Sequence, residues 1–125
     1  MTTQEVMTTE QIAKQFYQLA QEGQWDKIQS ELFSQDAQSI EPAGAVGFPE
    51  VVTGLDKIRE KGQLWAGMVE QYHGGYCKEP QVAGNFFACA MGTDITMKGE
   101  GRTAMDEIAL YKVQDGKIIS EQFFY

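Results

Sequence analysis

The residues best suited to chemistry in this sequence are carboxylates that stand among apolar residues close to the C-terminus. Two β-rich runs flank Asp115-Gly116, and this dipeptide favours a two-residue hairpin turn because both of its positions tolerate a positive φ. Counting outward from that turn pairs Val113 with Ile118 and Asp106 with Tyr125. Since paired residues share a face and alternate residues change face, the turn predicts which side chains point the same way.

In this register, Asp106 and Glu121 lie on the more apolar face of the hairpin. A carboxylate on a core-facing strand is costly unless it is paired or lines a cavity. We therefore expect both to line a pocket as acid, base or polar anchor, or else to bond to Tyr125, to the backbone or to water. A β-bulge between them would reverse one face, and would bring Glu107 in and send Asp106 out.

Glu41 is the strongest single candidate for a catalytic residue. It precedes Pro42, and a proline holds the residue before it extended. A carboxylate that enters an apolar pocket has its charged form disfavoured, so it can act as a general base or acid near neutral pH. The alternative is a solvated glutamate at the end of a strand.

His73, the only histidine, is a further candidate because imidazole exchanges protons readily near neutral pH. It could pair with one of the carboxylates, or it could be an ordinary strand histidine. One histidine with scattered carboxylates lacks the spacing of a metal site, so we expect no metal. The sequence shows no phosphate-binding glycine loop, nucleotide fingerprint or nucleophile elbow, so we expect no cofactor.

Aromatic and methionine side chains are frequent, and those that line a cavity would favour an apolar, ring-bearing ligand. The predicted catalytic residues are Glu41, Asp106 and His73. The predicted ligand contacts are Phe16, Tyr17, Trp65, Glu121, Phe123 and Tyr125.

The composition describes one globular domain over residues 1–125, with a polar lead-in over 1–8. Its 10 basic and 18 acidic residues give a net charge of -8, which argues against nucleic acid and anionic membrane surfaces as partners. The first residues lack a signal-peptide pattern, and no apolar run reaches the ~20 residues of a membrane helix. Cys77 and Cys89 lack metal-like spacing. We expect a cytoplasmic protein with two free thiols.

Helical spacing of apolar residues precedes strand-like segments along the chain. Helices are predicted near residues 9–22, 25–33 and 55–68. Strands are predicted over 37–41, 69–82, 86–97 and both arms of the closing hairpin. Residues 34–36 resemble a turn, 42–54 a loop, and Gly74-Gly75 a bulge. Helices followed by strands indicate an α+β domain with its helices on one face of the sheet.

This arrangement resembles the SnoaL-like branch of the nuclear transport factor 2-like superfamily, to which ketosteroid isomerase also belongs. The segments that carry the resemblance are LFSQDAQSIEPAG, residues 32–44, and MDEIALYKVQDGKIISEQFFY, residues 105–125. The resemblance implies a cone-like, cystatin-like α+β fold. In that fold a strongly curved antiparallel or mixed sheet wraps around three N-terminal helices and leaves a pocket. It also implies a homodimer formed through the outer face of the sheet.

The isomerase's catalytic residues are only partly present in this chain. Glu41 matches the position of its general base, as a longer carboxylate. Phe16, with Tyr17 beside it, stands where the isomerase has its oxyanion-hole tyrosine, and Ile108 or Ala109 stands at its protonated aspartate. With two of the three residues missing, the resemblance does not imply a ketosteroid isomerase.

The function that the resemblance implies is a cofactor-free isomerase, cyclase or dehydratase acting on a small apolar substrate. Glu41 would move a proton, and Asp106, His73 or Glu121 would polarise or anchor the substrate oxygen. The alternative is a non-catalytic domain that binds a small molecule or a partner, since one fold hosts many functions.

Overall fold

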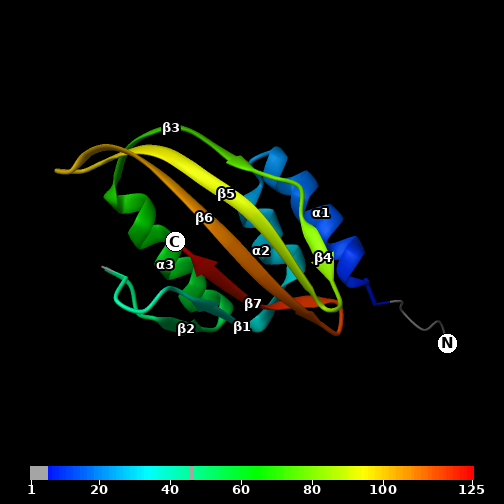
Figure 1. Ribbon diagram of the computed structural model, residues 1–125. Coiled ribbons are helices and arrows are strands. Elements are labelled where there is room, and N and C mark those ends of the chain that lie inside the picture. The colour runs from blue at the N-terminus through cyan, green and yellow to red at the C-terminus, as the bar shows by residue number, and fades with distance from the viewer. Residues whose placement is uncertain (1–5, 46) are drawn as a thin grey trace.

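A computed structural model describes residues 6–45 and 47–125 of the chain. The helices are α1 (Thr9–Gln21), α2 (Trp25–Leu32) and α3 (Leu55–Met68). The strands are β1 (Phe33–Ile40), β2 (Val51–Thr53), β3 (Val69–Cys77), β4 (Gln81–Ala83), β5 (Phe86–Met97), β6 (Gly101–Gln114) and β7 (Lys117–Phe124). Figure 1 shows the long strands β5 and β6 passing α1 and α2 near one end and α3 near the other.

The strands form one sheet in the order β2-β1-β7-β6-β5-β3, with β4 also paired to β5. β1 and β7 are parallel, and the other paired strands are antiparallel. The expected α+β architecture is therefore present, with a mixed sheet. β5 is central, as its apolar residues on both faces predict.

Local signals account for the start of α1. Thr8 accepts a hydrogen bond from the backbone N–H of Gln11, whose side chain accepts one from the Thr8 N–H, so two otherwise unpaired donors at the helix start are satisfied. The apolar stripe of the helix then buries Ile12, Phe16 and Leu19. α1 is thereby fixed against the sheet.

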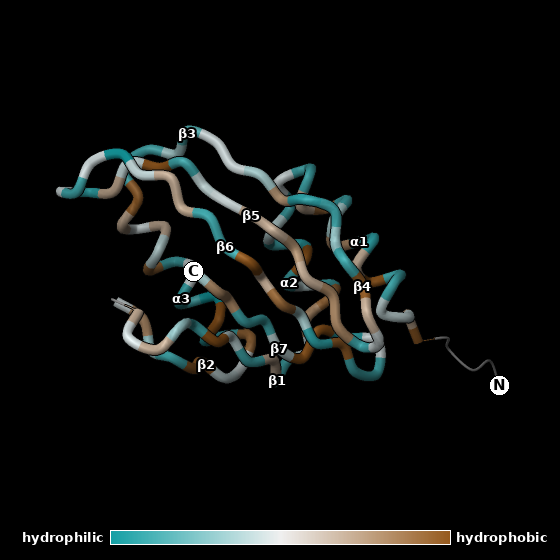
Figure 2. Tube along the Cα trace, in the orientation of Figure 1, coloured by the Kyte–Doolittle hydropathy of each residue, from teal (hydrophilic) through white to brown (hydrophobic). Residues whose placement is uncertain are grey.

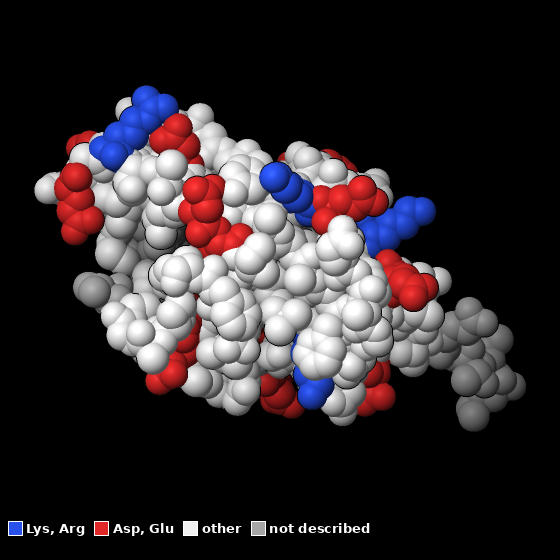
Figure 3. Space-filling view, in the orientation of Figure 1, with Lys and Arg blue, Asp and Glu red and all other residues white. Residues whose placement is uncertain are grey.

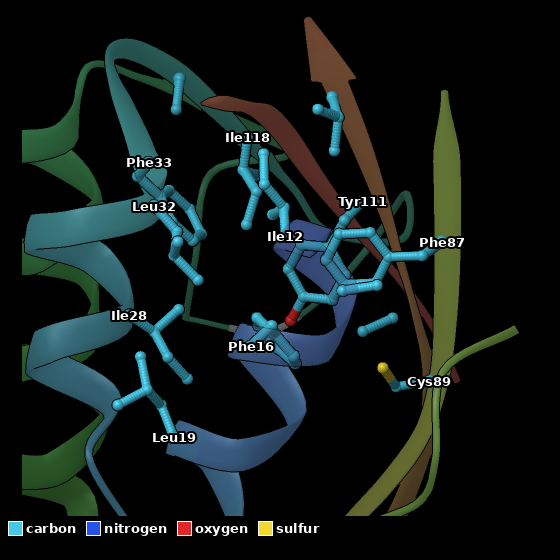
Figure 4. Close-up of a cluster of buried hydrophobic side chains, with 14 of the residues drawn as sticks. Ile12, Phe16, Leu19, Ile28, Leu32, Phe33, Phe87, Cys89, Tyr111 and Ile118 are labelled. Carbon is cyan, nitrogen blue, oxygen red and sulfur yellow. The ribbon is translucent and has the colours of Figure 1, made fainter. Parts of the chain in front are cut away.

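The main core fills the space between the sheet and the first two helices (Figure 4). Tyr111 packs between Phe16 of α1 and Phe87 of β5, with ring centroids 4.7 and 4.9 Å away. Aromatic pairs at this spacing add to the hydrophobic burial. Figure 2 shows apolar residues along the middle of β6 and hydrophilic residues in the turns at the strand ends.

Three predictions of local structure were wrong. The predicted loop over residues 42–54 contains the strand β2, because the β-branched Val51 and Val52 pair antiparallel with the end of β1. Residues 34–36 are not a turn, because β1 begins at Phe33 and pairs with β7. The pairing register shifts between Phe33 and Gln38, so these polar residues lie in an irregular part of the strand. Residues 69–82 are two strands, and the break includes Pro80, which has no N–H for a sheet ladder.

The closing hairpin confirms the predicted turn and corrects the predicted register. Asp115 and Gly116 have φ values of 51° and 75°, and Val113 pairs with Ile118. The register then shifts by one residue, so that Ile108 pairs with Phe124 instead of Phe123. Because β7 has one extra residue at this bulge, the β6 residues beyond it share a face with different β7 residues from those that the unbulged hairpin predicts.

Candidate functional site

A cavity of about 330 Å³ lies between the inner face of the sheet and the helices. Most of its wall is apolar, and the aromatic and aliphatic residues come from all three helices and from the sheet. The residues that line it include Phe16, Gln29, Glu41, Lys61, Trp65, Glu107, Tyr111, Glu121, Phe123 and Tyr125. Six of these were predicted site residues: Phe16, Glu41, Trp65, Glu121, Phe123 and Tyr125.

Lys61 is the centre of a hydrogen-bonded cluster at this cavity. Its Nζ lies 2.5 Å from Ser39 Oγ and 3.1 Å from Glu41 Oε1. The side chains of Lys61 and Glu41 are both only 11% exposed, so the ion pair is largely shielded from water. Shielding strengthens the attraction between opposite charges, and it makes the loss of either partner costly.

Sequence reasoning missed Lys61, although a signal was present. Ile58, Lys61 and Trp65 follow one another at helical spacing, so the lysine interrupts the apolar face of α3. Leu64, one position before Trp65, lies off this face and is 62% exposed. A lysine in an apolar stripe indicates a partner for its charge inside the fold.

Glu121 extends the cluster into the sheet. It is opposite Ser39 in the parallel β1–β7 pair, and its Oε2 accepts a hydrogen bond from Ser39 Oγ at 2.7 Å. Burial raises the pKa of Glu121, while the Ser39 hydrogen bond and the Lys61 charge oppose that rise. Glu121 is therefore held at the wall, as predicted from its place on the hairpin, and its carboxylate is partly neutralised by Lys61 through Ser39.

Tyr125 completes the cluster from the last position of the sequence. Its hydroxyl donates a hydrogen bond of 3.0 Å to Glu41 Oε2, so both oxygens of Glu41 have a partner. Burial and this bond to Glu41 raise the pKa of Tyr125 to about 12, which keeps the phenol protonated as a donor.

Glu107 is the acidic residue of the cavity that the hairpin bulge brings inward. Within the described residues it forms no hydrogen bond and no ion pair. Burial, together with the nearby charges of Glu41 and Glu121, raises the pKa of Glu107 to about 7, and Lys61 offsets part of that rise. Glu107 therefore exchanges its proton at neutral pH. The sequence offered it only as the alternative that a bulge would create.

Asp106 is the predicted site residue that the bulge removes from the cavity. Its side chain is exposed on the other face of β6, where Oδ1 accepts a 2.6 Å hydrogen bond from the Tyr76 hydroxyl. The predicted pairing of Asp106 with Tyr125 is wrong, since that count allowed no extra residue in β7. Asp106 and Glu107 have exchanged the places that the unbulged hairpin gives them.

Two other predicted residues lie apart from the cavity wall. His73 is on β3, where its Nε2 is 2.7 Å from Thr96 Oγ1 of the neighbouring strand. Tyr17 is half-buried on α1, one position from Phe16, and only Phe16 belongs to the wall. The structure does not bring His73 or Tyr17 together with Glu41.

Three further findings concern metal ligands, thiols and membrane-spanning helices. Over residues 6–45 and 47–125, no group of three or more histidine, cysteine, aspartate or glutamate side chains is arranged to hold a metal ion. Cys77 and Cys89 are buried and unbridged. In the same part of the chain, no helix combines the length and hydrophobicity needed to cross a bilayer.

Solved structures show what this fold resembles. A Mesorhizobium loti protein named as a SnoaL-like polyketide cyclase is 36% identical, with a TM-score of 0.86 over 95% of this chain and 100% of that chain. A ketosteroid isomerase-like fold from Catenulispora acidiphila, solved with trimethylamine, is 19% identical, with a TM-score of 0.69 over 94% and 87%. TerC, co-crystallized with polyporic acid, is 15% identical, with a TM-score of 0.73 over 94% and 90%.

Other structures with this likeness have cystatin-like and nuclear transport factor 2-like folds, so the expected cone-like α+β fold is confirmed. No curated protein matches the sequence significantly. A model of the SnoaL-like domain matches residues 7–125. Together with the 36% identity over nearly the whole chain, this match shows that the protein belongs to the SnoaL-like family.

Proposed function

We propose that this protein is an acid–base enzyme that transfers a proton on a small ring-bearing carbonyl compound. The observation that carries the proposal is the position of Glu107. Its carboxyl faces an apolar cavity with no hydrogen-bond or ion-pair partner among the described residues, beside a lysine that could receive the substrate oxygen. Isomerisation, cyclisation and dehydration all include such a proton transfer. None of these steps requires a metal or an organic cofactor.

Glu107 is the proposed general base. A base works best when its pKa is close to the working pH, and the pKa of about 7 at Glu107 satisfies that condition. No described residue donates a hydrogen bond to Glu107, so its carboxylate is free to contact a substrate. A substrate C–H facing Glu107 would therefore meet an accepting carboxylate in an apolar setting.

Lys61 is the proposed electrophile for the substrate oxygen. An ammonium has three donors, and the structure uses two of them on Ser39 and Glu41. The third can donate to a carbonyl oxygen whose negative charge grows as the proton leaves. Glu41, the base predicted from the sequence, is proposed here as the residue that positions Lys61, because Lys61 and Tyr125 already occupy its oxygens.

The wall of the cavity supports a ring-bearing substrate. Trp65, Phe123 and the other aromatic residues bury apolar surface and leave the polar groups to fix orientation. The relatives support the same class: the 36% identical protein carries the name of a polyketide cyclase, and TerC was crystallized with polyporic acid.

The test is exchange of substrate protons with deuterated solvent. β-Tetralone, a fused-ring ketone with acidic α-protons, is incubated with the protein in D₂O, and NMR follows deuterium incorporation. We expect the wild type to accelerate exchange and Glu107→Gln to lose about 100-fold or more, the typical contribution of a positioned base. Glu100→Gln, at an exposed turn residue, is the matched control. Undiminished exchange in Glu107→Gln would show that Glu107 is not the general base.

A non-catalytic binding domain is the second candidate, and one observation favours it. Lys61, Ser39, Glu41 and Tyr125 satisfy one another inside the chain, so the cluster can be a purely structural element that shapes a binding pocket. Saturable binding of the tetralone without exchange, in both the wild type and Glu107→Gln, would select this candidate over the enzyme.

We also propose a homodimer formed through the outer face of the sheet. Apolar side chains are exposed there, including the paired residues Ile108 and Phe124, which are 46% and 48% exposed. Figure 3 shows uncharged atoms over part of β5 and β6, with acidic and basic side chains beside them; the exposed ion pair of Asp94 and Arg102 lies on these two strands. Light scattering is expected to give a dimer mass for the wild type and a monomer mass for Ile108→Glu, since a charge in an apolar contact opposes association. A wild-type monomer at micromolar concentration would refute the dimer.

A further inference from the structure

Two polar side chains of the cavity are not used by the Lys61 cluster. Tyr111 of β6 and Gln29 of α2 both line the cavity, and neither forms a hydrogen bond to another described residue. They lie at the part of the cavity bounded by α1 and α2, where Phe16 and Ile28 also contribute to the wall. Both are therefore candidates for contact with a ligand.

Tyr111 is the more informative of the two because it is only 2% exposed. Among the described residues, no side-chain nitrogen or oxygen is both shut off from solvent and unpaired, so the Tyr111 hydroxyl, which has no described partner, opens to the cavity that the residue lines. Phenylalanine would fill the same place between Phe16 and Phe87 without the hydroxyl. Figure 4 shows the Tyr111 oxygen directed toward the helices beside Phe16.

Gln29 repeats the pattern seen at Lys61. Trp25, Ile28, Gln29 and Leu32 form the inward face of α2 at helical spacing, so a polar amide stands in an apolar stripe. Gln29 is half-buried, and its amide can donate and accept hydrogen bonds at the cavity surface. Tyr111 and Gln29 thus bring polar groups from a strand and a helix to the same end.

The spacing along β6 separates Tyr111 from Glu107, the proposed base. Tyr111 and Glu107 are four residues apart on the same face of the strand, so their Cα atoms are about 13 Å apart at about 3.3 Å per residue. A ring system fits between two polar groups at such a separation. The largely apolar wall of the cavity therefore presents polar groups at two places along β6.

We propose that Tyr111 and Gln29 form a second polar subsite, which receives an oxygen on the side of the substrate ring opposite the reacting carbonyl. This inference rests on the proposed function and narrows its substrate class to ring compounds oxygenated at both ends. Tyr111 donates to that oxygen and Gln29 supports it.

The protonation state of Tyr111 suits this role. Burial, and then the charge of Glu121 on the neighbouring strand, raise the pKa of Tyr111 well above its ordinary value. The phenol therefore stays protonated over the whole physiological range and is always available as a donor. A neutral carbonyl or hydroxyl oxygen is the matching acceptor, because an anionic one would lie close to Glu121.

The experiment compares two ligands that differ by one oxygen, β-tetralone and the analogue with a hydroxyl on the ring distant from the ketone. Calorimetric titrations use the Glu107→Gln protein, so that binding is measured without turnover. We expect the hydroxylated ligand to bind about 5–30-fold more tightly, the range of one buried hydrogen bond. Tyr111→Phe should abolish that preference and leave the affinity for β-tetralone within about twofold.

Tyr72→Phe, at a tyrosine of β3 that is 60% exposed, is the matched control and should keep the preference. Urea denaturation checks that Tyr111→Phe is folded, and its stability should equal or exceed that of the parent because a hydroxyl with no described partner is removed. A preference that survives in Tyr111→Phe, whether or not Gln29→Leu changes it, equal binding of the two ligands, or binding of neither would overturn the subsite.

The outcomes separate this proposal from the proposed function. Failure of deuterium exchange together with a Tyr111-dependent preference leaves the subsite in place and removes the enzyme. Exchange that depends on Glu107, with no Tyr111-dependent preference, supports the enzyme and removes the subsite.

Discussion

The inner face of β6 and β7 contains two regions that differ in how they use burial. Near the hairpin turn, Val113 and Ile118 are almost fully buried in a continuous apolar core. Farther along the same strands, Glu107, Glu121 and Phe123 line a cavity. The first region, which we call the packed half, excludes water through close contact. The second, the cavity half, buries charge instead.

The difference shows that one part of the sheet stabilises the fold, while another part holds the groups suited to chemistry. Apolar burial in the packed half is favourable at every pH, because no titrating group contributes to it. The cavity half contributes Glu107 and Glu121, and Glu41 and Lys61 approach them from just after β1 and from α3; this shielded space disfavours charge and moves the pKa of Glu107 to about 7. A site of this kind is destabilising, and the packed half must compensate for it.

The largest contrast should come from truncating one side chain in each half of β7. Ile118 is 0% exposed, so Ile118→Ala is expected to cost about 2–5 kcal/mol of unfolding free energy through lost burial and a new cavity. Phe123→Ala enlarges a space that already exists, and it should cost about 1–2 kcal/mol, well below the usual cost for a packed phenylalanine. Urea denaturation measures both. Equal costs would mean that the cavity half is packed as tightly as the core.

A smaller effect is expected from removing the lysine that approaches the cavity half. Lys61→Met leaves Glu41 without its cation in a shielded place, so it should cost about 2–4 kcal/mol of unfolding free energy near pH 7.

Lys57→Met is the matched control on the same helix, because Lys57 pairs with Glu60 in a bridge whose side chains are 66% and 61% exposed. An exposed pair typically contributes under about 1 kcal/mol, so the control should change little. If Lys61→Met changed stability as little as Lys57→Met, the cluster would not be a shielded ion pair.

The packed half could be predicted from the sequence because its signals are local. The Asp115-Gly116 turn depends on a backbone conformation that few other dipeptides adopt easily, and the structure confirms it. The stripe of α1 likewise predicted the burial of Phe16 from helical spacing alone. Neither inference required knowledge of distant contacts.

The cavity half was harder because its decisive feature is a one-residue bulge between two similar residues. Ile118 and Ile119 are both β-branched and apolar, so either could be the extra residue, and the choice decides whether Asp106 or Glu107 faces inward. The role of Lys61 depends on Ser39 and Glu41, which approach it from β1 and the residue that follows, far away in the sequence. Contacts of this kind come from the tertiary fold.

The pH dependence of Glu107→Gln sharpens the comparison further. In the folded protein, burial raises the pKa of Glu107 to about 7 from an ordinary value of 4.5, so the folded state favours the protonated carboxyl. The stability that this proton confers is complete below pH 4.5 and is lost as the pH rises through about 7. Glutamine resembles the protonated form and carries no charge at any pH.

Glu107→Gln should therefore match the wild type near about pH 4.5 and exceed its unfolding free energy by about 1–3 kcal/mol near about pH 8. Urea denaturation at both pH values measures the difference, and Glu100→Gln should show none because that side chain is exposed. A stabilisation that is equal at both pH values would mean that charge burial is not its cause. The expected result is a stabilisation confined to high pH in a variant that has also lost deuterium exchange. The same carboxylate would then both lower the stability of the fold and act as the proposed base.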